Sequence, residues 1–266
     1  MRRDLVKRGV INLLLLIILL IMWGYNEMSS ISDQSYTLDP REEQQTVPNP
    51  NLASYDEVIL LPYIWGMKYN ETTAKSLLKA ENLHPFDLGR MAFFLLFDGY
   101  KKKNKKELLL GKKYLDFLSE SYPLIFRRDQ IIVWKYPFQW GHLKAGWYSG
   151  MANSAIALAF MMGYQLFGKK KYKEMMFKAI NGVVFPVDEG GSALSLGKDR
   201  TWFFEYVWDG INNQNAKFVL NGYLFSLLTV KIFADQTGNT YYQTSYRNGL
   251  NALKSLSQQF YYPSGS

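Results

Sequence analysis

Apolar residues recur at helical spacing in six segments between residues 84 and 256, and the segments fall into three pairs. A short polar turn joins the two members of each pair, as in a helical hairpin. The pairs are expected to begin near Pro85, Met151 and Phe218, with turns at 99–104, 167–170 and 235–239. Asn104, Gly168 and Gly238, which mark these turns, lie 64 and 70 residues apart. A hairpin that recurs at a nearly fixed period is typical of a helical repeat array.

Long connections separate the hairpins, at residues 123–150 and 182–217, and the run 131–138 in the first of them predicts a short strand. Short turns should then lie at one end of the array and long connections at the other, where a site would be built. We expect an all-α-dominated fold over residues 54–266. Its form would be an (α/α) toroid or a partial toroid of helical hairpins, with short β segments in the loops.

An apolar run of 17 residues, from Gly9 to Tyr25, precedes this domain. At ~1.5 Å per residue it covers about 26 Å, close to the thickness of a bilayer core. Basic residues within 1–8 predict a cytoplasmic N-terminus. We therefore expect a transmembrane signal anchor over residues 1–27, an irregular stalk over 28–53, and an extracytoplasmic domain in a single-pass protein of the cell membrane. A cleaved signal peptide is the alternative.

Composition excludes several kinds of chemistry. The chain of 266 residues has no cysteine, so thiol catalysis, disulfides and thiolate metal sites are excluded, and its two histidines are too few for an all-histidine metal site. Its 19 Tyr and 7 Trp suit the stacking of sugars, although a tyrosine-rich core explains them as well. The net charge of +8 suits an anionic ligand, and lysines on a solvated surface are an equal explanation. Nucleic acid is not expected as a partner, because export would separate the two.

Four segments, in order, resemble the D-glucuronyl C5-epimerase family in its C-terminal catalytic domain. They are His84-Pro85-Phe86-Asp87-Leu88-Gly89, Gly146-Trp147-Tyr148-Ser149-Gly150-Met151-Ala152, Glu205-Tyr206, and Val219-Leu220-Asn221-Gly222-Tyr223. Residues 260–266 are similar to a degraded form of a further family segment. The resemblance implies an (α/α) toroid and the inversion of C5 in glucuronate units of a heparosan-like polymer. It also implies that Tyr206 and Glu205 are the catalytic pair.

The chain departs from the family pattern at three places. Asn153-Ser154-Ala155 stands where the family has Gln-Gly-Gln, and Val207-Trp208-Asp209-Gly210 stands where prolines are usual. The family also continues with a further Tyr-Asp pair on the far side of the cleft. We therefore expect that the second catalytic group comes from a further segment or a partner, or that the activity is lost.

C5 epimerisation removes a proton α to a carboxylate and returns one from the opposite face, so it needs two acid–base groups and no redox cofactor. No cofactor and no metal site is predicted. A tyrosine with an ordinary pKa of ~10 serves as a base only if nearby cations lower that pKa. Candidate cations for Tyr206 are Arg200, Lys135, Lys144 and His142. The predicted substrate-binding residues are Trp147, Tyr148, Asn153, Arg200, Trp202, Asn221 and His142.

Other functions stay open at this point. A uronate lyase would share the abstraction of the C5 proton, and a non-catalytic glycan-binding or assembly protein needs no acid–base pair. Asp188-Glu189 could serve hydrolysis, although adjacent carboxylates more often face solvent. The expected partner is an anionic uronate-containing polysaccharide, with the membrane as a second partner through the N-terminal helix, and a homodimer is left open.

Overall fold

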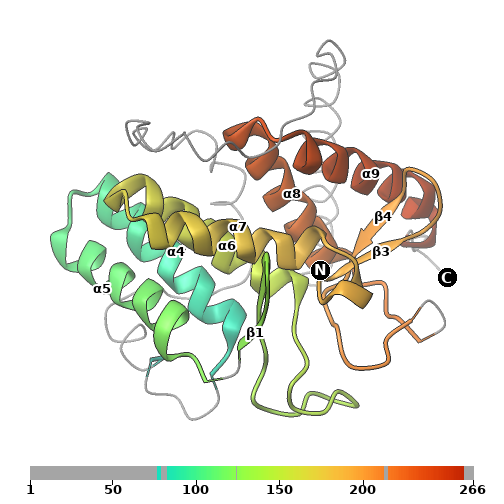
Figure 1. Cartoon of the computed structure of the whole chain (residues 1–266), viewed down its shortest axis with the longest axis horizontal. Helices are drawn as coiled ribbons and strands as arrows, with labels where there is room; N and C mark the ends of the chain where they lie inside the picture. Colours follow the sequence, from blue (N-terminus) through green and yellow to red (C-terminus); the bar gives the residue numbers. More distant parts are fainter. Residues whose placement is uncertain (1–76, 79–82, 124, 213–214, 261–266) are drawn as a thin grey trace, which may run out of the picture. The chain divides into compact units, whose positions relative to one another are not determined.

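The computed structural model describes residues 77–78, 83–123, 125–212 and 215–260. Six α-helices and two small sheets make up most of this part of the chain (Figure 1). The helices are α4 (Pro85–Lys101), α5 (Lys105–Asp116), α6 (Gly150–Phe167), α7 (Lys170–Val184), α8 (Leu220–Thr237) and α9 (Thr240–Leu256). They form the three consecutive hairpins predicted from the hydrophobic pattern, so the helix-rich fold is confirmed.

The hairpin turns form where local chemistry ends one helix and starts the next. Asn104 caps α5 by accepting hydrogen bonds from the backbone N–H groups of Lys106 and Glu107. Gly168 and Gly238 end α6 and α8 in the left-handed conformation, each with φ of 64°, which glycine adopts at little cost. The turn predicted at 235–239 consists of Gly238 and Asn239 alone, because α8 continues to Thr237 and α9 begins at Thr240.

The first helices of the three hairpins pack against one another near their N-termini. A Cβ atom placed on Gly89 of α4 would lie 2.7 Å from the backbone nitrogen of Ile156 in α6, so these helices approach closely only because that side chain is absent. The rings of Phe86 in α4 and Phe225 in α8 meet edge to face, with centroids 5.6 Å apart. The second helix of each hairpin packs against the first, and the long connections lead from the ends of α5 and α7 to the starts of α6 and α8.

The connections fold into two antiparallel β-hairpins. Strand β1 (Ile125–Arg128) pairs with β2 (Ile131–Trp134), and β3 (Ala193–Ser195) pairs with β4 (Thr201–Phe203). The strand expected within 131–138 is therefore present as β2, whereas its partner β1 was not predicted. The indole N–H of the buried Trp134 donates to the carbonyl of Leu118, which ties β2 to the end of the first helical hairpin.

Several expectations concern residues outside those that the structure describes. They are the transmembrane anchor at 1–27, the stalk at 28–53, the start of the domain at 54 and the segment 261–266. Among the described residues, no helix is both long enough and apolar enough to cross a bilayer. The anchor thus stays a prediction from the sequence.

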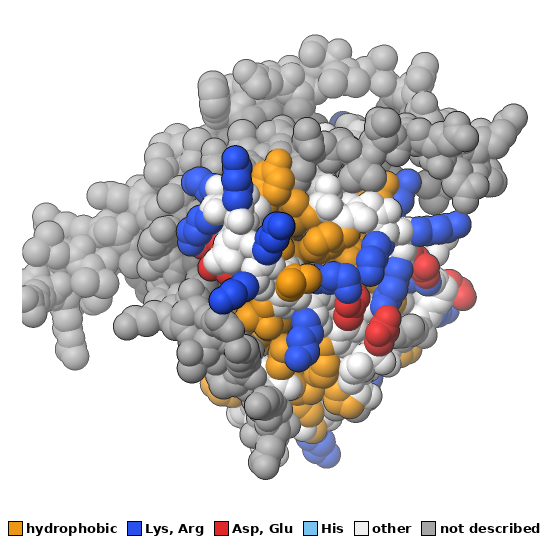
Figure 2. Space-filling model, turned by 90° about the vertical axis from the view of Figure 1, so that its left-hand side faces the viewer, with side chains coloured by type: hydrophobic (Ala, Val, Ile, Leu, Met, Phe, Trp, Pro, Cys, Tyr) orange, Lys and Arg blue, Asp and Glu red, His pale blue; other side chains and the backbone are white. Residues whose placement is uncertain are grey.

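One face of the described part is rich in lysine. The α4–α5 turn and α5 lie at the left of Figure 1. Figure 2 views that side and shows Lys and Arg side chains around patches of hydrophobic side chains, with few acidic groups. Helix α5 buries Gly111, Tyr114 and Leu115, whereas Leu109 and most of its lysines face outward.

Two leucines of α5 differ in burial, so replacing each of them tests this packing. Leu115 is fully buried and Leu109 is 68% exposed. We expect Leu115→Ala to lower the free energy of unfolding by about 2–5 kcal/mol, because it leaves a cavity. The matched Leu109→Ala should change it by less than about 0.5 kcal/mol. Urea unfolding followed by circular dichroism measures both, and equal losses would contradict the described orientation of α5.

Candidate functional site

A small β ladder organises the connection end of the hairpins. Tyr148 lies between two other segments and forms isolated antiparallel bridges with Lys135 on one side and Val207 on the other. The Tyr148–Val207 bridge has two backbone hydrogen bonds of 2.9 Å. The ladder therefore joins the first connection to the second, which lie about 60 residues apart in the sequence.

Neighbouring residues of this ladder point to opposite faces, as in any strand. Lys135, Tyr148 and Val207 line a groove on one face. Their neighbours Tyr136, Trp147 and Tyr206 form a stack on the other. The rings of Tyr136 and Trp147 lie parallel with centroids 3.7 Å apart, and Tyr206 follows at 5.6 Å from Trp147.

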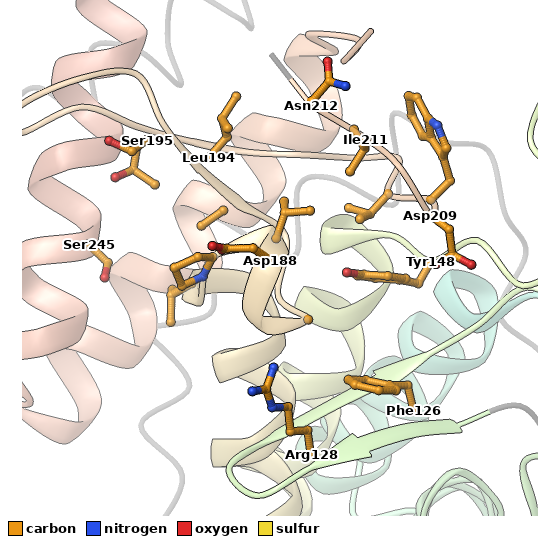
Figure 3. A pocket seen from close by; sticks show the side chains of 18 of the residues that line it. Phe126, Arg128, Tyr148, Asp188, Leu194, Ser195, Asp209, Ile211, Asn212 and Ser245 are labelled. Carbon is orange, nitrogen blue, oxygen red and sulfur yellow. The ribbon is translucent and has the colours of Figure 1, made fainter. Parts of the chain in front are cut away.

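The groove has a volume of about 1160 Å³ and lies between the β1–β2 hairpin and helix α9 (Figure 3). Phe126 and Arg128 reach it from β1, and Ser245 reaches it from α9. Asp188 and Asp209 add two carboxylates, so the cations and acids of its wall balance. Its aromatic and hydroxyl side chains suit a saccharide. It does not include the predicted catalytic pair, which lies on the opposite face of the ladder.

Glu205 is buried at the start of α8. A Cβ atom on Gly222 would collide with its Oε2 atom, so the carboxylate can occupy this position only because residue 222 is glycine. Oε2 has no hydrogen-bond partner among the described residues. Burial raises the pKa of Glu205, and interactions with the Tyr206 hydroxyl and the Gly222 backbone N–H oppose that rise in part.

Tyr206 is half-buried and lies beside Glu205. Burial, together with the interaction with the Glu205 carboxylate and the charge of that group, raises the pKa of Tyr206 above its ordinary value. This corrects the expectation that cations lower that pKa. A phenol whose pKa is raised keeps its proton at neutral pH, so Tyr206 stands beside Glu205 as a protonated phenol.

The cations proposed for Tyr206 lie elsewhere. Arg200 is exposed in the turn between β3 and β4, so it is at the far end of β4 from Glu205. Lys135 extends over the ring of Phe126 on the groove side, 5.8 Å from its centroid. Lys144 and His142 are exposed, and the His142 ring lies 3.4 Å from Lys217 Nζ and edge-on to Trp208.

Two tryptophans expected to stack on sugars are instead packing residues. Tyr136 covers the face of Trp147, whose indole N–H donates to the carbonyl of Phe138. Trp202 is fully buried and stacks on Tyr223 at 3.7 Å. Neither ring offers a free face, because each fills the space between a connection and a helix start.

Asn153 is also internal rather than open to a substrate. It is fully buried, its amide nitrogen donates to the carbonyls of Ile132 and Ala179, and its amide oxygen lies 3.4 Å from the backbone nitrogen of Trp134. The side chain thus ties β2 to α6 and α7.

The two remaining predicted substrate-binding residues, Tyr148 and Asn221, differ in their exposure to solvent. Tyr148 is mostly buried, but it lines the groove and donates its hydroxyl hydrogen to the carbonyl of Gly191. Asn221 is exposed in the first turn of α8, whose N-cap is Val219. Asp188 and Glu189 are both exposed, in line with the expectation that adjacent carboxylates face solvent.

The structure adds a cluster of polar side chains, formed by His84, Asp87 and Arg90, that the residue types alone did not indicate. His84 caps α4, and its Nδ1 lies 3.3 Å from Asp87, which also accepts a hydrogen bond from Arg90. The His84 ring meets Tyr136 edge-on at 4.9 Å, so this group adjoins the aromatic stack of Tyr206. Burial lowers the pKa of His84, and Asp87 opposes this, so the ring is neutral at neutral pH. The only signal in the sequence was the position of His84 before a helix-opening proline.

No cluster of three or more His, Asp or Glu side chains that could hold a metal ion occurs in the part of the chain that the structure describes. The chemistry available at this end of the hairpins is therefore built from the tyrosine–glutamate pair, the histidine group and the groove.

Replacement of Asn153 tests its internal role. We expect Asn153→Ala to lower the free energy of unfolding by about 2–4 kcal/mol, because buried backbone groups of β2 and α7 lose their partner. Asn251, whose amide bonds the Asp199 carbonyl at the surface, provides the control, and Asn251→Ala should cost less than about 1 kcal/mol. Denaturant unfolding would contradict this role of Asn153 if both variants were equally stable.

The raised pKa of Glu205 gives a pH-dependent stability with a defined sign. The folded protein holds this proton more tightly than the unfolded chain, so the site loses stability as pH rises from about 4.5 through the folded pKa. Glu205→Gln removes the ionisable group. We expect this variant to be more stable than the unsubstituted protein at pH 8, with the difference vanishing near pH 4. Exposed Glu189→Gln is the control, and urea unfolding at both pH values would refute the expectation if Glu205→Gln were the less stable at pH 8.

Comparison with known proteins gives matches that include this end of the hairpins. The chain is 28% identical over 186 residues to an uncharacterized protein of Methanocaldococcus jannaschii. The match covers 63% of this chain and 57% of that protein, so the chain spans less than two thirds of the relative's length.

A family model described as the D-glucuronyl C5-epimerase C-terminus matches residues 128–266. The matched region is more than half of the chain and contains the ladder, the groove apart from Phe126, helices α6–α9 and the Glu205–Tyr206 pair. The chain therefore belongs to the D-glucuronyl C5-epimerase family, through that family's C-terminal domain.

Proposed function

We propose that this protein is a uronate C5-epimerase that converts D-glucuronate to L-iduronate within an anionic polysaccharide. The observation that supports it best is the buried carboxylate of Glu205 beside the half-buried phenol of Tyr206, where burial raises the pKa of both groups. The three hairpins would form an arc of an (α/α) toroid, with this pair at the end where the long connections lie.

The pair can move a proton without leaving a free phenolate in the resting site. In one direction, C5 gives its proton to the Tyr206 oxygen while Tyr206 passes its own proton to Glu205. The electron pair of the broken C–H bond moves into the uronate carboxylate, which becomes an enediolate. Because burial raises the pKa of Glu205, its carboxylate is a stronger base than an exposed one.

A second group must return a proton to the opposite face of C5. We assign His84 as the candidate among the described residues, because it is partly exposed, accepts a hydrogen bond from the Asp87 backbone N–H and is adjacent to the same aromatic stack. A neutral imidazole can relay a proton between its two nitrogens. A segment outside the described residues, or a second copy of the chain in a homodimer, is the alternative source of this group.

The groove on the other face of the ladder would hold a neighbouring part of the polymer. Arg128 and Lys135 offer cations to uronate carboxylates, and Tyr148 and Tyr241 offer aromatic edges. The transmembrane anchor predicted at 1–27 would hold the domain outside the cell membrane, where it would meet polysaccharide rather than nucleic acid. Neither a cofactor nor a metal has a part in the proposed reaction.

A lyase is the second candidate, because a phenol that keeps its proton suits protonation of a departing C4 oxygen. The test is deuterium exchange. The full chain is incubated in D₂O with a glucuronate-containing polysaccharide and the product is read by NMR. Deuterium at C5 with iduronate signals supports the epimerase, and a C4–C5 double bond supports the lyase. Binding of polymer without label would instead indicate a glycan-binding protein.

Tyr206→Phe tests the assigned group. We expect it to lower the exchange rate about 10²–10⁴-fold, because the proton relay is lost while the ring remains. Tyr164→Phe, on the outer part of α6, is the matched control and should retain the rate of the unsubstituted protein. Unchanged exchange in Tyr206→Phe would remove this residue from the mechanism.

A further inference from the structure

The lysine-rich face at the turn end of the hairpins is separate from the site described above. Residues 98–120 and 169–174 hold eleven lysines, five acidic residues and no arginine. Exposed members are Lys101, Lys102, Lys103, Lys105, Lys106, Lys113, Lys169 and Lys170. We name these two segments together the lysine face.

Printed contacts show that the two segments form one surface. Lys171 of α7 pairs with Glu120 just beyond α5, and the Tyr172 hydroxyl donates to Asp116 of α5 at 2.7 Å. Lys112 and Lys169 both contribute to the lowered pKa of Asp116, so lysines from both segments converge on one carboxylate. The remaining positive charge faces outward (Figure 2).

Apolar side chains lie among these lysines. Leu109 is 68% exposed, and Leu108 and Leu110 are half-buried on the same helix. Leucine offers a saccharide neither a flat face nor a hydrogen bond. Lysines around an exposed leucine on a helix are instead typical of a protein segment that rests on a lipid surface.

The chemistry therefore favours one partner, the surface of a bilayer with anionic headgroups. Lysine ammonium groups would lie at the level of the lipid phosphates, and Leu109 of α5 would enter the headgroup boundary. We propose that the lysine face docks on anionic phospholipid. This proposal does not depend on the proposed enzymatic activity.

Docking in this way would orient the site. Helix α4 has 17 residues, so its ends are about 25 Å apart. His84 at its start adjoins the Tyr206 stack, whereas Lys101 at its end belongs to the lysine face. Lipid bound around the α4–α5 turn would leave His84 and the Tyr206 stack, at the opposite end of α4, open to a polymer.

The absence of cysteine allows a single reporter to be placed on the face. The full chain with Leu109→Cys is labelled with a polarity-sensitive fluorophore and mixed with vesicles of phosphatidylcholine alone or with an equal share of phosphatidylglycerol. We expect a blue shift and at least a twofold rise in emission with the anionic vesicles only, lost in 0.5 M salt. A fluorophore on Gln139→Cys, at the exposed connection end, should not respond.

Charge removal supplies the matched comparison. Lys105→Gln with Lys106→Gln should raise the lipid concentration for half-maximal response about 30-fold. Lys144→Gln with Lys198→Gln removes the same charge at exposed positions elsewhere and should leave the response unchanged. Circular dichroism verifies that every variant is folded.

Several results would overturn the proposal. An equal response to neutral and anionic vesicles would attribute membrane contact to another part of the chain. A response to a glucuronate-containing polysaccharide without lipid would make the face a polymer site. A response that grows with protein concentration in the absence of lipid would make it a contact between copies, and no response in any condition would leave the face solvated.

Discussion

The structure depends on how closely neighbouring segments can approach the first helix of each hairpin near its start. Gly89 lies in the second turn of α4, and Gly150 and Gly222 lie in the first turns of α6 and α8; at each one a Cβ atom would collide with a neighbouring segment. Gly150 admits the Phe204 carbonyl, and Gly222 admits the Glu205 carboxylate. Because these side chains are absent, the second connection can lie directly over the helix starts. A bulkier residue at Gly150 or Gly222 would displace the second connection and the groups it positions, and one at Gly89 would separate α4 from α6.

This close approach also explains the properties of the Glu205–Tyr206 pair. A carboxylate that packs against a helix start loses water, so its pKa rises, and burial together with that carboxylate raises the pKa of the neighbouring phenol. Burial of that charge lowers the free energy of unfolding of the protein. Such a cost is common where a protein keeps a proton acceptor ready for chemistry.

The β ladder divides the connection end into two faces with different chemistry. Tyr136, Trp147 and Tyr206 form an aromatic stack beside the histidine group, and Lys135, Tyr148 and Val207 form the wall of a polar groove. A single bridge residue, Tyr148, thus joins both connections and separates the candidate reaction centre from the candidate polymer groove. The lysine face, at the other end of α4, completes an arrangement in which membrane contact and polymer contact need not compete.

The sequence by itself determined the hairpins, because hydrophobic spacing, Asn104, Gly168 and Gly238 act within a few residues of one another. It also determined the family, because the order of the motifs along the chain can be recognised without the structure. It could not determine exposure in the connections: Trp147, Trp202 and Asn153 had the composition of a binding surface, yet neighbours far along the chain cover them. The direction of the Tyr206 pKa shift, and the place of His84 beside the aromatic stack, likewise follow from burial and from contacts between distant segments. Only the tertiary structure decides those, because desolvation depends on what packs around a group and not on which residues precede it.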